Sequence, residues 1–274
     1  MSWCATASRS RRAAHRIAVG PRYRRDVSPD LALALRLADA ADAISLPLFR
    51  SGLSIETKLD LTPVTEADRA VETELRRLIE AERPADAILG EEHGATAGGA
   101  RRWILDPIDG TRNYARGVPI WATLVALEEA GIVRLGVVSA PALGHRWWAE
   151  RGVGAFADGV SMRVSAISQI ESAVLSLSLD NPLPELATRA WHSRGLGDFW
   201  AHMLVAEGAV DGAIDSVEVS EWDLAAVQVV VEEAGGTLTD ASGASRIDSG
   251  TAVTSNGLLH DKLLAALASG GLHH

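Results

Sequence analysis

The segment Asp106–Asn113 (DPIDGTRN) holds the densest group of side chains able to do chemistry in this sequence. Two carboxylates three residues apart, with a rigid proline between them, can converge at a turn, and the carbonyl of Ile108 can point the same way. Oxygen ligands of this kind suit a hard divalent cation such as Mg²⁺. Gly110 permits close backbone approach, and the amides after it can open a helix that holds a phosphate. The alternative is an ordinary turn that caps a helix.

Three further acidic residues, far apart in the sequence, could join this pair. Glu91 ends a short apolar run, Asp223 begins a helical pattern, and Asp68 lies in the first turn of another predicted helix. Each has an ordinary structural explanation: a solvated surface for Glu91, an N-cap for Asp223 and a favourable first-turn acid for Asp68. With Asp106 and Asp109 they form a set of five carboxylates spread along the chain.

These acids lie at the ends of predicted strands and helices. A first helix is predicted over residues 31–50, and a second follows the capping residue Thr65 and ends before Pro84. Short apolar strands lead into Gly90 and into Asp106. The remaining strands are predicted over residues 120–128, 132–139, 145–150, 154–156, 174–179 and 251–254, and the remaining helices over 199–209, 223–234 and 258–267. This order predicts a layered α/β (α+β) fold with largely antiparallel sheets.

Charge is spread unevenly along the 274 residues. The formal net charge is −10, although residues 1–29 hold seven arginines against the single Asp26. The rest of the chain is therefore strongly acidic, and because an acidic surface repels polyanions, we expect neither nucleic acid nor membrane as a partner. We expect residues 1–29 to be a disordered Arg-rich tail or an overlong translation start, and residues 30–272 to form a single domain.

Cysteine content and hydropathy bear on the cellular compartment. The single cysteine, Cys4, allows no intrachain disulfide. No apolar stretch reaches the roughly 18 residues of a membrane span, and the N-terminal tail lacks the apolar core of a secretory signal. We therefore expect a cytoplasmic protein.

Three motifs occur in an order and spacing that resemble a known superfamily. Gly90-Glu91-Glu92, the segment Asp106–Asn113, and Trp222-Asp223 with Glu233–Gly236 resemble the inositol monophosphatase superfamily, and the resemblance runs from about residue 30 to the C-terminus. It implies an αβαβα layered sandwich, usually a homodimer. It also implies a phosphomonoesterase that uses two or three Mg²⁺ ions to act on a small phosphorylated metabolite. Bound metal would reconcile an acidic chain with an anionic substrate.

The same resemblance implies a role for individual residues. The implied metal ligands are Glu91, Asp106 and the Ile108 carbonyl for a first ion, Asp106, Asp109 and Asp223 for a second, and Glu91 and Asp68 for a third. Glu91 and Thr111 would orient or deprotonate the attacking water, and the amides of Gly110 and Thr111 would hold phosphoryl oxygens. Metal coordination would lower the pKa of that water and screen its repulsion by the phosphate dianion.

Substrate choice is suggested by a closer resemblance to the histidinol-phosphatase branch. Residues 60–68, 136–149 and 194–199 carry it. It implies hydrolysis of L-histidinol phosphate to L-histidinol and phosphate, a step of histidine biosynthesis. Arg194 would then touch the substrate or its phosphate, and Asp198 would meet the amino or imidazole group. Asp198 could instead be the N-cap of the helix that follows.

An inositol-1-monophosphatase, or a phosphatase of another small sugar or nucleotide phosphate, is the alternative. The superfamily commonly has a substrate-binding glutamate seven residues before the motif's aspartate, and this chain has Ser216 there. Asp215 and Glu218 lie nearby and would be the candidate contacts in that case.

Overall fold

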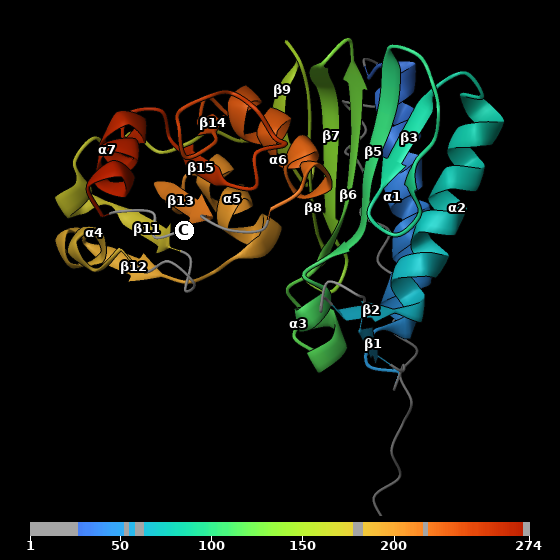
Figure 1. The fold of residues 1–274 in the computed structure, drawn as a ribbon, viewed down its shortest axis with the longest axis horizontal. Coiled ribbons are helices and arrows are strands. Elements are labelled where there is room, and N and C mark those ends of the chain that lie inside the picture. Colours follow the sequence, from blue (N-terminus) through green and yellow to red (C-terminus); the bar gives the residue numbers. More distant parts are fainter. Residues whose placement is uncertain (1–26, 52–54, 58–62, 178–182, 216–218, 271–274) are drawn as a thin grey trace, which may run out of the picture.

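The computed structural model describes residues 27–51, 55–57, 63–177, 183–215 and 219–270. Its elements stack as helix, sheet, helix, sheet and helix layers, so the predicted αβαβα sandwich is confirmed (Figure 1). Three pairs of helices make the outer, middle and opposite outer layers: α1 (Pro29–Leu48) and α2 (Glu66–Glu82), α5 (Asp198–Ala206) and α6 (Glu221–Glu233), and α4 (Pro184–Arg189) and α7 (His260–Gly270).

The larger sheet brings two of the predicted motifs to one edge. Its order is β10-β9-β8-β7-β6-β5-β3-β4. The strands are β3 (Ala87–Gly90), β4 (Gly94–Ala95), β5 (Arg101–Asp109), β6 (Ala122–Glu129), β7 (Ile132–Ala140), β8 (His145–Glu150), β9 (Gly154–Ala157) and β10 (Val160–Ser161). Among these described strands only β3 and β5 pair in parallel, with Gly90 opposite Leu105. Because parallel strands end at the same edge, Glu91 and Asp106 emerge side by side.

The smaller sheet has the order β12-β11-β13-β15-β14. Its strands are β11 (Val174–Leu177), β12 (His192–Arg194), β13 (Gly212–Asp215), β14 (Thr237–Thr239) and β15 (Ala252–Ser255). Of its described pairings, β11 with β12 and β11 with β13 are parallel. Antiparallel pairing therefore dominates the larger sheet more than the smaller one. The sequence did not predict β12, β13 or β14, because such short segments become strands through their neighbours rather than through an apolar pattern.

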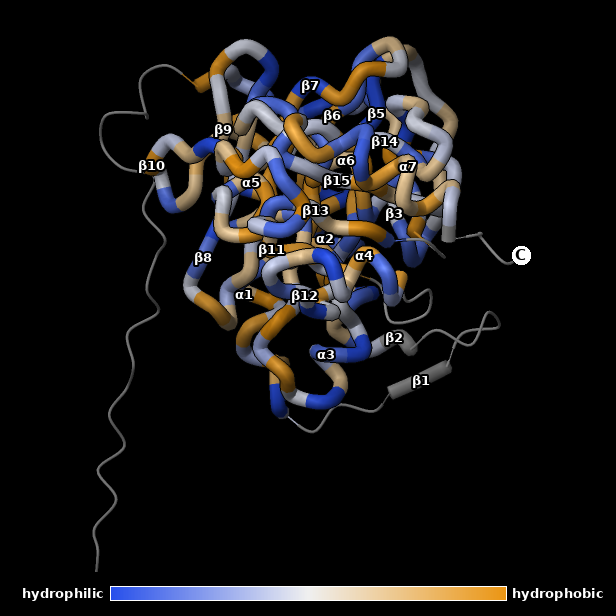
Figure 2. Tube along the Cα trace, turned by 90° about the vertical axis from the view of Figure 1, so that its left-hand side faces the viewer, coloured by the Kyte–Doolittle hydropathy of each residue, from blue (hydrophilic) through white to orange (hydrophobic). Residues whose placement is uncertain are grey.

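Alternating side chains along the larger sheet separate two hydrophobic cores. On β5, Trp103 and Leu105 face the core under α1 and α2, whereas Ile104 faces the core under α5 and α6. Figure 2 shows hydrophobic segments gathered in the middle of the molecule. Gly136 on β7 allows α6 to approach closely, since a Cβ atom there would lie 2.6 Å from the carbonyl oxygen of Ala226. The body of α6 therefore packs directly against β7.

The remaining described elements are β1 (Ile55–Thr57), β2 (Pro63–Thr65), α3 (Thr111–Arg116) and the short 3₁₀ helix η1 (Ile170–Ser172). Thr65 caps α2 as predicted, and α1 begins at Pro29 with Ser28 as its N-cap. Residues 1–26 of the predicted tail, residues 58–62 and residues 216–218, with Ser216 and Glu218, lie outside the described residues. Within the described chain, no helix is both long and apolar enough to cross a bilayer.

Candidate metal centre

An irregularity in β5 turns Asp106 and Asp109 to the same side. In a regular strand residues three apart point to opposite faces. Here the pairing with β6 shifts register between Asp106 and Asp109, which face Leu124 and Ala122 respectively. One extra residue on β5 thus forms a bulge, and bulges re-aim side chains next to functional sites. The Thr123 hydroxyl donates to the Pro107 carbonyl at 2.8 Å and holds the bulge in place.

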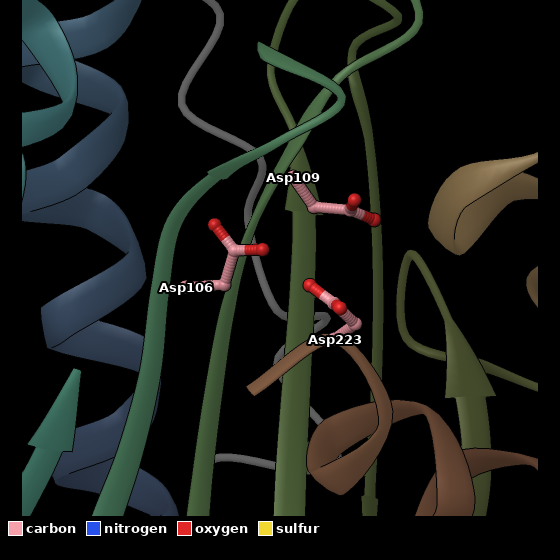
Figure 3. Close-up of side chains that lie close together, drawn as sticks. All are labelled: Asp106, Asp109 and Asp223. Carbon is pink, nitrogen blue, oxygen red and sulfur yellow. The ribbon is translucent and has the colours of Figure 1, made fainter. Parts of the chain in front are cut away.

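Asp223, in the first turn of α6, completes a compact group of three carboxylates with Asp106 and Asp109. One oxygen from each lies within 4.8 Å of the others (Figure 3). Backbone amides hold two of the three groups: Ser220 N donates to Asp223 Oδ2 and Phe199 N donates to Asp109 Oδ2, each at 2.6 Å. Oδ1 of Asp106 is buried and has no hydrogen-bond partner within the described chain.

The electrostatics of this group call for a cation. Burial first, and then the charges of Glu91, Asp109 and Asp223, raise the pKa of Asp106 well above its ordinary value. Burial also raises the pKa of Asp109, and it raises the pKa of Asp223 to about 6. Clustered buried carboxylates are unfavourable unless a positive charge compensates them. An all-oxygen donor set with an unpaired buried Oδ1 fits a hard divalent metal ion.

Glu91 and Asp68 border the group, as the sequence predicted. The Glu91 amide donates to the Leu105 carbonyl at 3.3 Å, which ties Glu91 to β5 just before Asp106. Asp68 is fully buried, and its Oδ2 accepts from Thr65 N at 2.8 Å and from Thr65 Oγ1 at 2.5 Å. It is thus both a capping residue of α2 and a neighbour of the centre, because its charge raises the pKa of Asp106. The two interpretations of Asp68 are compatible.

Thr111, Ile108 and Gly110 lie at the turn from β5 into α3. The Thr111 hydroxyl is 3.0 Å from the Ile108 carbonyl oxygen and 3.3 Å from Asp68 Oδ1, so it can donate its proton to either. Gly110 is the N-cap of α3 and has a φ of 80°, in the left-handed region that favours glycine. A Cβ atom there would lie 3.0 Å from the Ile120 carbonyl oxygen. The backbone of Gly110 can therefore turn the chain from β5 into α3.

The two predicted substrate contacts differ in position. Asp198 is the first residue of α5 and accepts a hydrogen bond of 3.1 Å from Asn113 Nδ2. The N-cap is Gly197, so the alternative interpretation of Asp198 as a helix cap is wrong. Asp198 has a φ of 49°, a conformation that is uncommon for residues other than glycine and often marks a functional site. Arg194, at the exposed end of β12, donates to the Ser193 carbonyl, and no described contact joins it to the carboxylates.

Two groups near the centre were not recognised in the sequence. His202 is buried on α5 and joins Asp215 Oδ2 and Thr254 Oγ1, each at 2.8 Å. His202 lies four residues after Asp198, and this spacing places both residues on one face of the helix, which could have revealed His202 from the sequence. The second group, around Glu72, is described below.

The charges around Asp198 affect its ionisation. Partial desolvation, followed by the charges of Asp215 and Asp223, raises the pKa of Asp198 to about 6.

Comparisons with known proteins agree with this fold and centre. The family model described as the inositol monophosphatase family matches residues 26–271. A histidinol-phosphatase of Mycobacterium tuberculosis is 50% identical, over 88% of this chain and 98% of that protein, and one of Streptomyces coelicolor is 48% identical over the same shares. The crystal structure of the suppressor protein suhB from Bartonella henselae superposes with a TM-score of 0.84 at 29% identity, over 89% of this chain and all of that one.

The fold, the carboxylate centre and these relatives together define a phosphoric monoester hydrolase. The chain belongs to the inositol monophosphatase family.

Proposed function

We propose that the protein is a Mg²⁺-dependent phosphatase that hydrolyses L-histidinol phosphate to L-histidinol and phosphate. The observation that supports this best is the acidic centre of Asp106, Asp109 and Asp223 with a second pair of acids, Asp198 and Asp215, beside it. The first group suits metal ions and the phosphate that they hold. The second group suits a positively charged alcohol on the other side of the scissile bond.

The metal part of the proposal uses the predicted ligand set. Glu91, Asp106 and the Ile108 carbonyl would hold one ion, Asp106, Asp109 and Asp223 a second, and Glu91 with Asp68 a third. Bound Mg²⁺ would lower the pKa of a coordinated water and screen its repulsion by the phosphate dianion. Mg²⁺ is proposed because carboxylate and carbonyl oxygens are its preferred protein ligands.

The chain's own residues would orient the water and the phosphate. When the Thr111 hydroxyl donates its proton to Asp68 or to the Ile108 carbonyl, its oxygen is left to accept a hydrogen bond from the attacking water. Glu91 would take up the proton that this water loses. The amides of Gly110 and Thr111 begin α3, and the first amides of a helix have no acceptor within it, so they can donate to phosphoryl oxygens.

The choice of alcohol rests on charge. L-Histidinol carries an ammonium group and an imidazole, whereas inositol is uncharged. Asp198 directly precedes Phe199, whose amide donates to Oδ2 of Asp109 at 2.6 Å. The carboxylate of Asp198 therefore lies beside a proposed metal ligand, and it would lie close to a phosphate bound by the metal. Two further acids, Asp215 and Asp223, lie close enough to raise the pKa of Asp198, and Arg112 lowers it. Acidic groups therefore predominate around Asp198. A cationic alcohol would neutralise their charge.

The relatives and the family resemblance bear on the substrate and on the oligomeric state. The histidinol-phosphatase names of the two bacterial relatives support the same substrate. Inositol 1-phosphate, or another sugar or nucleotide phosphate, is the alternative substrate because the family is named for inositol monophosphatase. The homodimer implied by the resemblance remains a prediction, which size-exclusion chromatography with light scattering tests.

Phosphate release by the purified chain tests this proposal. L-Histidinol phosphate and myo-inositol 1-phosphate are compared with Mg²⁺ and with EDTA. We expect EDTA to abolish turnover and kcat/KM to favour histidinol phosphate by at least about tenfold, which corresponds to about 1.4 kcal/mol. A preference for inositol 1-phosphate would contradict the substrate and retain the metal centre. Turnover that resists EDTA would contradict the metal centre itself.

A further inference from the structure

Glu72 is a charged residue in a position where charge is costly. It lies on α2 with its side chain fully shielded from solvent. An ionised carboxylate is tolerated in such a place only when it is paired and hydrogen-bonded. Nothing in the proposed reaction uses Glu72 directly, so its retention inside the protein needs another explanation.

All the described partners of Glu72, apart from one arginine, belong to the loop that presents Glu91. Its Oε2 accepts from the amide of Glu92 at 2.7 Å, and its Oε1 accepts from the amide of His93 at 3.2 Å. Arg76, one turn later, donates to Oε1 at 2.7 Å and also binds the Gly94 carbonyl. Glu72 and Arg76 together thus bind the backbone of the three residues that follow Glu91, namely residues 92–94.

Gly90 shows how closely the side chain and the loop fit. A Cβ atom at Gly90 would lie 2.1 Å from Glu72 Oε1 and 2.4 Å from its Cδ, which is far inside van der Waals contact. Glycine at this position therefore lets the carboxylate reach across the end of β3 to the amides of the loop. The loop is held on both sides of Glu91, since the amide of Glu91 itself donates to Leu105 on β5.

The position of Glu72 on α2 connects two parts of the proposed centre. Asp68 and Glu72 are four residues apart and so lie on one face of the helix. Asp68 meets Thr111 at the centre, and Glu72 holds the neighbouring loop. A shift of α2 would consequently move two proposed ligands together.

We propose that Glu72 is a positioning residue that fixes the Glu91 loop, with Arg76 as its counter-ion and Gly90 as the space it needs, and thereby sets the affinity of the site for Mg²⁺. This inference rests on the proposed ligand role of Glu91. The physical reason is preorganisation: residues that orient metal ligands reduce what binding costs, and their loss typically weakens metal affinity about 10–100-fold.

Glu72→Gln is the direct test, because glutamine has the same size but lacks the charge, and its NH₂ group would face an N–H of the loop or of Arg76. Glu74→Gln is the matched control: it changes the same residue type on the same helix at a part-exposed side chain paired with Arg77. Mg²⁺ affinity of the full chain is measured by isothermal titration calorimetry, after circular dichroism has verified folding. We expect the Kd of Glu72→Gln to rise about 10–100-fold and that of Glu74→Gln to stay at the wild-type value.

A second approach keeps the inference testable if Glu72→Gln does not fold. Gly90→Ala keeps the glutamate at position 72, but the added methyl group would push its carboxylate away from the loop. This variant should therefore also weaken Mg²⁺ binding. A lower melting temperature with an unchanged Kd in the folded variant would overturn the inference, because a merely structural role predicts that result.

Glu91→Gln separates this inference from the proposed function. If Glu72 acts through Glu91, the Glu72→Gln change should weaken Mg²⁺ binding no further in the Glu91→Gln background, as a double-mutant cycle would show. If Glu91→Gln raises the Kd and Glu72→Gln does not, only the positioning role is wrong. If Glu91→Gln itself leaves the Kd unchanged, the proposed ligand role of Glu91 is wrong.

Discussion

The amide of Phe199 donates a hydrogen bond of 2.6 Å to Oδ2 of Asp109, across 90 positions of sequence. This bond joins the first turn of α5 to the end of β5. It holds one oxygen of a proposed metal ligand and, through the neighbouring residue, fixes Asp198 next to the same carboxylate group. A single backbone hydrogen bond therefore links the part of the site proposed to hold the phosphate to the part proposed to hold the alcohol.

Replacing Asp106 by asparagine should abolish activity and leave the fold intact. Asp106 would be shared by two ions, and metal ions supply several kcal/mol of transition-state stabilisation, so we expect turnover to fall by at least about 1,000-fold. In EDTA the variant should melt at a higher temperature than the wild type, because asparagine replaces a carboxyl group whose ionisation is opposed by burial and by the neighbouring acids. Phosphate release and thermal denaturation measure these effects, with the exposed Asp261→Asn as control. Near-full turnover would refute the shared-ligand role.

The stability of the metal-free protein should decrease as pH rises through about 6. Desolvation raises the pKa of Asp223 to about 6 from an ordinary value of 3.8, and the pKa of the more exposed Asp198 is raised in the same direction. The folded state therefore binds more protons than the unfolded state between these values, and the stability gained below 3.8 is lost as pH increases. Bound Mg²⁺ should reverse the trend, since protons compete with it for the same oxygens.

Melting temperatures measured from about pH 4 to about pH 7, in EDTA and in Mg²⁺, test this linkage. In EDTA, Asp223→Asn should show a shallower pH dependence than the wild type. Identical slopes for the two proteins would show that Asp223 does not titrate in this range.

Asp198→Asn should alter substrate preference rather than catalysis in general. Asparagine tolerates the left-handed backbone conformation of this position, and it can still accept the hydrogen bond from Asn113. The change removes only the charge, so kcat/KM for L-histidinol phosphate should fall by about tenfold, while that for inositol 1-phosphate stays constant. An equal loss on both substrates would instead place the effect on the metal centre, through the Phe199–Asp109 bond.

The N-terminal boundary of the domain can be tested by truncation. We predict that a chain beginning at Val27 keeps its activity and melting temperature, because Val27 packs against the core under α1 and Ser28 Oγ accepts from Leu31 N at 3.0 Å. A chain beginning at Asp30 loses this N-cap, and its free energy of unfolding should drop by about 1–2 kcal/mol. Denaturant titration of both chains measures the difference, and equal stabilities would show that the cap contributes nothing.

The sequence alone determined the class of chemistry and most of the layers. Asp106, Asp109 and Asp223 belong to motifs that are recognisable without a structure, and the alternating and helical apolar patterns located the long elements. These signals are local: a carboxylate beside a turn, or a periodicity of two or 3.6 residues, is visible within a short window. The short strands β12, β13 and β14 had no such signal, because three or four residues are too few for an apolar pattern and only pairing with their neighbours makes them strands.

The positions and contacts of the residues around the centre follow from the tertiary structure alone. That Asp198 is the first residue of α5 and not its cap, that Arg194 lies at the exposed end of β12, and that Glu72 holds the Glu91 loop all depend on where distant segments meet. A glutamate in an amphipathic helix looks like a solvent-exposed residue until the packing of β3 buries it. The physical reason is that burial and long-range hydrogen bonds belong to pairs of segments, and a single segment of sequence carries no information about its partner.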